Sequence, residues 1–516
     1  MKKTLKFWSW LLALGILASS CYKDLGNYDY VELDEITIDT AGRGILADYA
    51  VFRYDTLRID PRVLLNGQEI SSAAQAGDKL AFTWSIFQAT TGGTVHTRDT
   101  LSHELTLAAP IVKPAGQWVV VLSVKNQETG VETYQRFSVQ VDEVLSDGWM
   151  VLYEKDGNTD VGLIVDDWSK RGVVQPRTFT DLIRSSNGQP LLGAPRALLH
   201  SASALATAEV LVASAQDMVA VDRSSFQIVY PFEKLFWSPP AKGEVGYFST
   251  NLARKELVIH NNRVHMTNFA SSGTARINYF GAAYLGDYGD LADWTPSFFG
   301  QAADAIVYDQ TAKHFLYVPI NGSTFQSFPP QSEALTKFDV NNVGLDLEAF
   351  DWGWQNMEYM AMKDANAHYL LASNFMLPQL DRLGAGKYEI SGIPAGTSIT
   401  TMASAAAGQY VLLGTANQVH LFKYNTGQPA EVEWTAPAGE TITCVRIQKF
   451  YHAQLQAILL PMTNRVVYIA TWNESTKEGK VYSYLIDPTN GTIDRSSERV
   501  ATGFGKIKDM SYKWQL

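Results

Sequence analysis

A short apolar strand recurs along most of this chain, and most copies are followed by a polar turn and a further strand. Seven copies can be recognised, at residues 150–152, 211–213, 257–259, 315–317, 369–371, 411–413 and 458–460. The peptide PAGTSIT at 394–400 also recurs as PAGETIT at 437–443, an offset of 43 residues. Repeats of about 40–50 residues that each contain a few strands are typical of β-propeller blades.

The two ends of the repeat region are complementary. Six copies have another strand before them, near Leu198, Gly246, Ile306, Met360, Met402 and Val445. The first copy, at Met150, has none, while the chain ends with an unassigned strand at 507–512. If that last strand completes the first sheet, both observations are explained and exposed sheet edges are covered. We therefore predict an all-β chain in which residues 147–516 form a seven-bladed β-propeller closed by the C-terminal strand. A large sandwich or an open β-solenoid is the alternative.

Residues 30–143 have a different pattern, because apolar and polar side chains alternate without a long repeat. Alternation is clear at 80–86, 118–124 and 137–141, and turn residues lie between these segments. Period-two alternation predicts strands with one buried face each. This region is therefore predicted to be a separate β-sandwich with an immunoglobulin-like arrangement.

The first residues have the features of an export signal. Three lysines (Lys2, Lys3 and Lys6) precede an apolar run at 7–18, which is too short to span a bilayer. Small residues follow and end at Cys21, so the segment resembles a bacterial lipoprotein signal. That resemblance implies a signal peptide at 1–20, a lipid on the Cys21 thiol and a tether at 21–29. An ordinary signal with a chance cysteine is the alternative.

Two segments of the sandwich region, 82–85 (FTWS) and 116–124 (GQWVVVLSV), resemble the paired core strands of PKD-type domains. The opening CYKDLGNYDY at 21–30 resembles the PKD-like family of lipoproteins from Bacteroidota. This resemblance implies a location in the outer membrane, and partners that include a Sus-type transporter and its lipoproteins. Lys23-Asp24 partly resembles the signal for display on the cell surface.

Composition excludes some classes of function. The net charge is −11, and removal of residues 1–20 with their three lysines makes it −14, which argues against nucleic-acid binding. Cys444 is the only other cysteine, so no disulfide framework exists, and its apolar neighbours predict a buried thiol. No motif indicates a cofactor, and no cluster of ligands indicates a metal site.

Two groups of residues are candidates for a binding site. Polar residues stand two places before each inner-strand position and would face a central channel: Arg196, Glu244, Asp304, Glu358, Thr400, Thr443 and Lys508. The alternative is a water-filled channel with solvated side chains. The second group is aromatic, and Trp294, Trp352 and Trp354 are its candidates for stacking on a ligand or filling a pocket in a partner. These aromatics could instead cover the ends of the blades.

Two functions from different classes remain open. The first is a binding lipoprotein that takes a glycan or peptide nutrient, or docks on an uptake complex. The second is a glycoside hydrolase or lyase, which requires two carboxylates flanking the scissile bond, and Asp304 with Glu358 is the pair to test. The residues favour binding, because the aromatic loops are distinctive and the carboxylates are ordinary.

Overall fold

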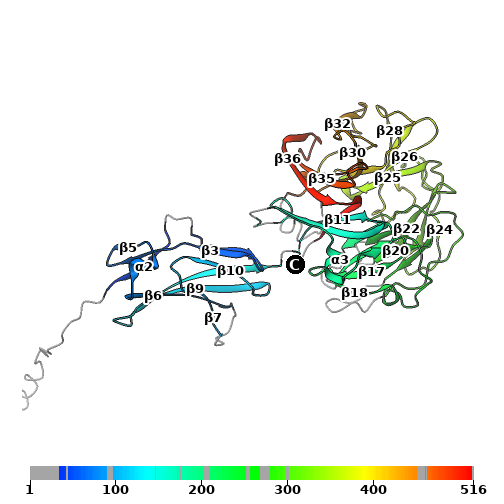
Figure 1. Cartoon of the computed structure of the whole chain (residues 1–516). Helices are drawn as coiled ribbons and strands as arrows, with labels where there is room; N and C mark the ends of the chain where they lie inside the picture. The colour runs from blue at the N-terminus through cyan, green and yellow to red at the C-terminus, as the bar shows by residue number, and fades with distance from the viewer. Residues whose placement is uncertain are drawn as a thin grey trace, which may run out of the picture. The chain divides into compact units, whose positions relative to one another are not determined.

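The structure is a computed structural model that describes residues 34–41, 45–89, 97–143, 145, 147–170, 173, 176–200, 209–250, 256–267, 279–297, 302–449, 460 and 462–513. Contacts divide the chain into two compact units, unit 1 (Met1–Asp142) and unit 2 (Glu143–Leu516). In both units nearly all of the regular secondary structure is β-strand (Figure 1). The prediction of an all-β chain is confirmed. The signal peptide, Cys21 and the tether lie outside the described residues.

The described residues of unit 1 form three sheets. The largest has the order β2 (Asp48–Phe52), β10 (Glu132–Asp142), β9 (Gly116–Asn126), β6 (Leu80–Gln88), β7 (Asp99–Ser102). A second sheet contains β1 (Ile36–Asp39), β4 (Arg62–Leu65) and β5 (Gln68–Ile70), and a third pairs β3 (Thr56–Ile59) with β8 (Leu107–Pro110). A short helix, α2 (Ala73–Ala76), precedes β6.

The core of unit 1 follows from the alternation in its sequence. Trp84 is fully buried at its centre and stacks on Phe137, with ring centroids 5.9 Å apart. The Trp84 indole N–H donates a hydrogen bond of 3.0 Å to the carbonyl oxygen of Glu104, so its polar atom is satisfied. Along β9 and β10 the side chains that point away from this core are partly or fully exposed, except for Val121, which is buried.

Unit 2 contains seven separate sheets among its described residues, numbered here in chain order. Sheet 1 has the order β13 (Arg177–Phe179), β12 (Asn158–Val165), β11 (Gly148–Lys155), β37 (Lys506–Lys513), and β14 (Leu191–Leu192) also pairs with β12. Helix α3 (Leu182–Asn187) lies between β13 and β14 in the chain. Sheet 2 is β15 (Pro195–His200), β16 (Glu209–Ser214), β17 (Met218–Asp222), β18 (Ile228–Tyr230), and sheet 3 is β19 (Val245–Thr250), β20 (Glu256–His260), β21 (Arg263–Met266).

The remaining four sheets follow the same plan, in which consecutive strands pair antiparallel. Sheet 4 is β22 (Ala303–Asp309), β23 (His314–Pro319), β24 (Gln326–Ser327), and sheet 5 is β25 (Asp346–Trp352), β26 (Glu358–Lys363), β27 (His368–Ser373), β28 (Gly384–Ile390). Sheet 6 is β29 (Thr401–Ser404), β30 (Val411–Gly414), β31 (Gln418–Phe422), β32 (Glu431–Thr435), and sheet 7 is β33 (Glu440–Ile447), β34 (Val466–Asn473), β35 (Glu478–Ile486), β36 (Ile493–Phe504). Two 3₁₀ turns, η1 (Phe232–Lys234) and η2 (Trp354–Asn356), lie between strands.

The C-terminal strand completes the first sheet of unit 2, as the sequence predicted. β37 pairs antiparallel with β11 from Gly148 opposite Lys513 to Glu154 opposite Lys506. The first strands of neighbouring sheets also lie side by side, because β37 packs between β33 and β15, and β29 packs between β25 and β33.

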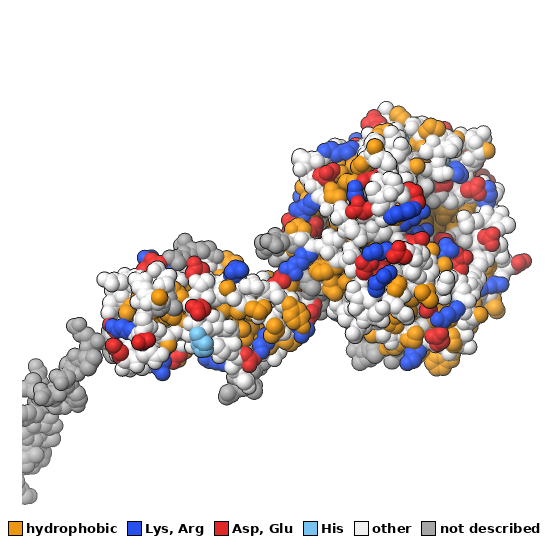
Figure 2. Space-filling view, viewed as in Figure 1, with side chains coloured by type: hydrophobic (Ala, Val, Ile, Leu, Met, Phe, Trp, Pro, Cys, Tyr) orange, Lys and Arg blue, Asp and Glu red, His pale blue; other side chains and the backbone are white. Residues whose placement is uncertain are grey.

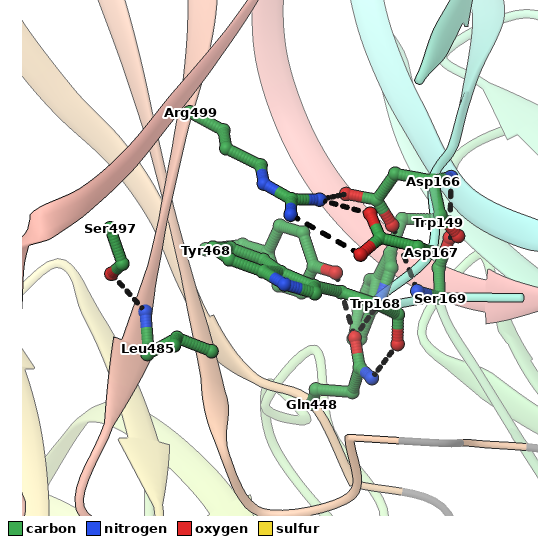
Figure 3. A network of polar contacts seen from close by, with 10 residues as sticks. All are labelled: Trp149, Asp166, Asp167, Trp168, Ser169, Gln448, Tyr468, Leu485, Ser497 and Arg499. Carbon is green, nitrogen blue, oxygen red and sulfur yellow. Dashed lines mark hydrogen bonds and ion pairs between the residues drawn. The ribbon is translucent and has the colours of Figure 1, made fainter. Parts of the chain in front are cut away.

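A network of polar contacts joins sheet 1 to sheet 7 (Figure 3). The Gln448 side chain accepts hydrogen bonds from the Trp149 indole (3.0 Å) and the Tyr468 hydroxyl (2.7 Å), and it donates one to the Trp168 carbonyl (2.6 Å). The Arg499 guanidinium, from β36, lies 3.6 Å from the Trp168 ring centroid and pairs with Asp167 at 2.6 Å. Side chains from the first and last sheets therefore satisfy each other's buried polar atoms.

Two assignments made from the sequence are wrong. In sheet 7 the partner of β33 is β34, whereas the sequence placed that strand at 458–460, where residues 458 and 459 lie outside the described residues. In sheet 5 the strand near Met360 is β26, the second strand, because β25 precedes it and forms the edge of the sheet. Both errors arise where two short apolar segments follow each other, because periodicity alone cannot decide which of them pairs.

Candidate functional site: a cavity lined by bulged strands

A β-bulge recurs at one position in the sheets of unit 2. In six sheets the first strand has one extra residue that no residue of its neighbour opposes, with β37 as the first strand of sheet 1. The extra residues are Lys508, Arg196, Gly246, Asp304, Glu348 and Thr443, in sheets 1, 2, 3, 4, 5 and 7. In sheet 6, Thr401 pairs with Gly414, and the Thr400 N–H donates a hydrogen bond of 2.9 Å to the Gly414 carbonyl. Thr400 therefore occupies the position equivalent to the extra residue of the other sheets. We call these seven residues the bulge positions.

Six of the seven bulge positions line one cavity of about 510 Å³. They are Arg196, Gly246, Glu348, Thr400, Thr443 and Lys508. An extra residue bends its strand and changes the direction of its side chain, and such bulges occur often beside active sites. A cavity of this volume is within the range of small-molecule sites. Figure 2 shows basic and acidic side chains gathered near the middle of the visible face of unit 2.

The bulge position in sheet 3 is a glycine, and Asp293 takes the place of its side chain. A Cβ built on Gly246 would lie 2.2 Å from Asp293 Oδ1. Asp293 itself lines the cavity, in the segment before β22. Desolvation raises the pKa of the Asp293 carboxyl, while Lys508 and Arg196 oppose this increase. The carboxylate is therefore close enough to both cations to interact with them electrostatically.

The predicted channel residues divide into two groups. Arg196, Thr400, Thr443 and Lys508 line the cavity, as a shared inward level would require. Glu244 lies just before β19 and forms an ion pair with the Arg196 guanidinium. The alignment error in sheet 3 explains this position, because the bulge falls at Gly246 and not at Glu244.

The two carboxylates of the enzyme hypothesis are not among the residues that line the cavity. Asp304 occupies the bulge position of sheet 4, but it is buried and accepts a hydrogen bond of 2.7 Å from the Asn321 N–H. Glu358 begins β26, the second strand of sheet 5, and accepts one of 2.8 Å from the Ser297 N–H. The bulge position of that sheet is instead Glu348, which the sequence did not identify.

The aromatic candidates lie at different depths. Trp294 is 1% exposed and packs against Phe350, with ring centroids 5.5 Å apart. Trp352 is partly buried, and the Lys449 ammonium lies 4.6 Å from its ring centroid. Trp354 packs against the apolar cluster between sheets 5 and 6. Trp294 therefore contributes to the core, whereas part of each of the other two rings reaches the surface.

One aromatic residue that sequence reasoning missed is exposed. Trp237 is 80% exposed, and its backbone N–H donates a hydrogen bond of 3.0 Å to the carbonyl of buried Phe280. Its ring lies edge-on to Tyr279, with centroids 6.2 Å apart. The only signal in the sequence is the pair of prolines at 239–240, which marks the segment as a loop.

The cavity also contains a thiol. Cys444 is buried on β33, as predicted, and desolvation raises the pKa of its thiol to about 12. The Sγ atom lies 3.8 Å from Asp509 Oδ1, and Asp509 pairs with Arg446 at 2.5 Å. A thiol with a pKa this high stays protonated near neutral pH and is a poor nucleophile.

The described part of the chain contains no group of three or more His, Cys, Asp and Glu side chains that could hold a metal ion. Nor do the described residues include a helix long and apolar enough to cross a membrane. Charged side chains and hydroxyl groups are among the polar groups that line the cavity.

Comparison with known proteins gives one family match. The model of the PKD-like family matches residues 21–195, which include the described part of unit 1 and the first strands of unit 2. No curated protein matches the chain.

Solved structures with similar architecture are distant. A quinonprotein alcohol dehydrogenase-like protein from Bacteroides thetaiotaomicron is 13% identical, with 92% of this chain and 99% of that chain covered and a TM-score of 0.39. YCF48 from Cyanidioschyzon merolae is 9% identical, with 62% and 95% covered and a TM-score of 0.38. Similarities this distant say nothing about what the present chain binds.

Proposed function

We propose that this chain is an exported, lipid-anchored binding protein, and that the cavity of unit 2 takes a small polar ligand. The observation that supports this most is the set of bulge positions, because six sheets each contribute one of them to a single cavity. A bulge costs regular hydrogen bonds in its ladder, so its repetition in sheet after sheet at one cavity requires a reason. Ligand recognition by redirected side chains supplies that reason.

The same positions support a seven-bladed propeller for unit 2. Seven sheets repeat one strand plan, β37 completes sheet 1, and the bulges recur at equivalent positions in the first strands. In a propeller these strands surround a central channel, and ligands bind at its mouth. We therefore propose that the seven sheets form the blades of one closed ring.

Binding is favoured over hydrolysis. Asp304 and Glu358 are buried, accept backbone hydrogen bonds and do not line the cavity. A hydrolase needs its acid and its nucleophile or base beside an open substrate site. We propose that the chain captures its ligand at the cell surface for a Sus-type outer-membrane transporter, and the resemblance of residues 21–30 supports this part of the proposal.

The cavity can be tested by filling it. Thr400 and Thr441 are exposed residues that line it, so Thr400→Trp and Thr441→Trp should block it with little effect on folding. Thermal shift would screen the mature protein against oligosaccharides, amino acids and dipeptides. Ligands that stabilise the parent protein should stabilise neither variant. If every hit stabilises the variants equally, the cavity is not the site.

The anchor can be tested separately. Cys21→Ala should move the protein from the membrane fraction to the soluble fraction, because the lipid is the proposed attachment. Cys444→Ala is the control, since that thiol is buried in unit 2 and should leave the fractionation unchanged. Retention of Cys21→Ala in membranes after a high-salt wash would exclude the lipid as the main anchor.

A further inference from the structure

The charges around the cavity are mostly neutralised by other parts of the chain. The Arg196 guanidinium pairs with Glu244, which lies outside the cavity lining. Arg446 pairs with Asp509 at 2.5 Å, and both line the cavity. The Glu348 carboxylate pairs with Lys363 at 2.9 Å and accepts a contact of 2.8 Å from the His368 ring. These charged groups are therefore already paired within the protein.

Two opposite charges are left over. Lys508 is exposed at the bulge position of sheet 1, and Asp293 is exposed where the side chain of Gly246 would be. Among the described residues, no hydrogen bond or ion pair satisfies either side chain, although each is in the electrostatic field of the other. Lys506, the remaining charged residue of the lining, lies instead in the field of Glu474.

Two further polar atoms are unsatisfied at the same cavity. Arg196 Nε and Thr443 Oγ1 are buried atoms that have no hydrogen-bond partner among the described residues. A buried polar atom without a partner costs free energy, so in native structures such atoms usually bind water or a ligand. The Nε–H group is a donor, and the hydroxyl both donates and accepts.

We propose that the ligand is a zwitterion of amino-acid to dipeptide size, with its carboxylate on Lys508 and its ammonium group on Asp293. The inference rests on the proposed function and names the class of its ligand. A cation and an anion that face one cavity without pairing leave room for a molecule that carries both charges. Arg196 Nε and Thr443 Oγ1 supply hydrogen bonds to the carboxylate or to a peptide group between the charges. A neutral sugar would displace water from both charged groups without supplying an opposite charge to either, so the site favours a zwitterion over a sugar.

Matched probes separate the two charges. Titration calorimetry of the mature protein would compare L-alanyl-L-alanine, its N-acetyl derivative, which is only an anion, and its C-terminal amide, which is only a cation. L-alanine, with both charges closer together, distinguishes a free amino acid from a peptide. Each charge-assisted hydrogen bond should contribute about tenfold or more in affinity, so the zwitterion should bind most tightly. The proposal is overturned if the three dipeptide probes bind with equal affinity, or if neither L-alanyl-L-alanine nor L-alanine binds.

Variants assign the charges to residues. Lys508→Gln should abolish the preference for the free dipeptide over its amide, and Asp293→Asn should abolish its preference over the N-acetyl derivative. Lys508→Arg keeps the charge and should retain both preferences. If Lys508→Gln and Asp293→Asn leave both preferences intact, the assignment is wrong. The proposed function fails separately, if Thr441→Trp leaves the binding of every ligand unchanged.

Discussion

The two units use β-strands in opposite ways. In unit 1, β9 pairs with β10 from Gly116 to Lys125 and with β6 from Trp118 to Asn126, and neither pairing contains a register shift. In unit 2, six of the seven first strands contain a register shift, and Thr400 occupies the equivalent place in the seventh. The alternation along β9 puts every second side chain from Trp118 to Val124 into the core of unit 1. Each bulge of unit 2 instead releases one residue from the alternation.

The difference indicates where binding groups can lie. A residue in a regular strand faces either the core or the solvent, and both choices are fixed by the fold. No residue on the neighbouring strand opposes a bulge residue. Strand pairing therefore constrains its side chain less, and that side chain can serve in binding. Five of the seven bulge positions place a charged group or a hydroxyl at the cavity, and these are Arg196, Glu348, Thr400, Thr443 and Lys508. Asp304 is buried, and Gly246 is covered by Asp293.

The largest expected effect comes from removing β37. Truncation after Gly505 should unfold unit 2 and leave unit 1 folded, because β37 pairs with β11 and buries Ile507, Met510 and Tyr512. Loss of a large buried apolar side chain costs about 2–5 kcal/mol, so three exceed a stability of about 5–15 kcal/mol once the strand pairing is also lost. Hydrogen exchange with mass spectrometry reports on both units in one experiment.

The control for this truncation keeps the strand. Lys506→Ala with Lys508→Ala removes two exposed side chains and leaves the backbone pairing and the buried residues in place. It should retain the exchange protection of unit 2. Equal protection in the truncated and full-length proteins would contradict the role of β37.

Single-residue deletions test the comparison directly. Deleting Val121 from β9 should unfold unit 1, because Val121 pairs with both Arg136 and Ser85 and its loss turns half of the strand inside out. Deleting Thr443 from β33 should be tolerated, since Ile442 and Cys444 already oppose the adjacent residues Thr471 and Ala470. Thermal melting of the two variants checks this, and similar losses of stability would show that the bulge is a structural requirement.

Much of this organisation could be predicted from the sequence. The strand without a partner at 507–512 and the missing partner of Met150 were sufficient to predict the pairing of β37 with β11. Five of the seven bulge positions were identified, because a polar residue stood two places before an apolar strand in each repeat. These features are local, and the alternation of strands makes local patterns informative.

The remaining positions depend on contacts that are remote in the sequence. Glu348 was missed because β25 contains Phe350 and Trp352, so the segment was interpreted as part of an aromatic loop. The position of Asp293 beside Gly246 could not be predicted, since a glycine gives no sign that a carboxylate from another segment occupies the space of a side chain. The pairing of charges around the cavity could not be predicted either, because Lys363 and His368 reach Glu348 from two other strands, β26 and β27.

A buried lysine at the end of β37 should make the stability of unit 2 depend on pH. Lys513 donates hydrogen bonds to the carbonyls of Leu145 and Arg223, and desolvation lowers its pKa to about 7. Because the pKa of this lysine is lower in the folded state than in the unfolded state, unit 2 becomes more stable as the pH rises from about 7 towards the usual pKa of a lysine. It becomes less stable as the pH falls through the same range. Between these two pKa values, the free energy of unfolding should rise by up to about 1.4 kcal/mol per pH unit, which is the free energy of one pKa unit.

Removal of the titrating group should remove that slope. Lys513→Met should show a smaller increase in the free energy of unfolding between pH 7 and 9 than the parent protein, measured by urea denaturation. Lys506→Met, which replaces an exposed lysine on the same strand, controls for the lost charge. Parallel pH profiles for the parent protein and Lys513→Met would exclude titration of Lys513 as the cause.

The smallest expected effects separate the two parts of the network between sheets 1 and 7 (Figure 3). Gln448→Leu leaves the Trp149 indole N–H and the Tyr468 hydroxyl without their buried acceptor, at a cost of about 1–3 kcal/mol. Arg499→Gln removes a partly exposed cation from Asp166, Asp167 and the Trp168 ring. It should cost about 1 kcal/mol or less, because Asp166 keeps its hydrogen bond from the Ser169 N–H. Both variants would be compared by urea denaturation with and without about 0.5 M NaCl, which screens exposed ion pairs. The salt should reduce the loss of stability caused by Arg499→Gln and leave that of Gln448→Leu unchanged. If Arg499→Gln costs more than Gln448→Leu, the exposed cation and not the buried amide holds the first and last sheets together.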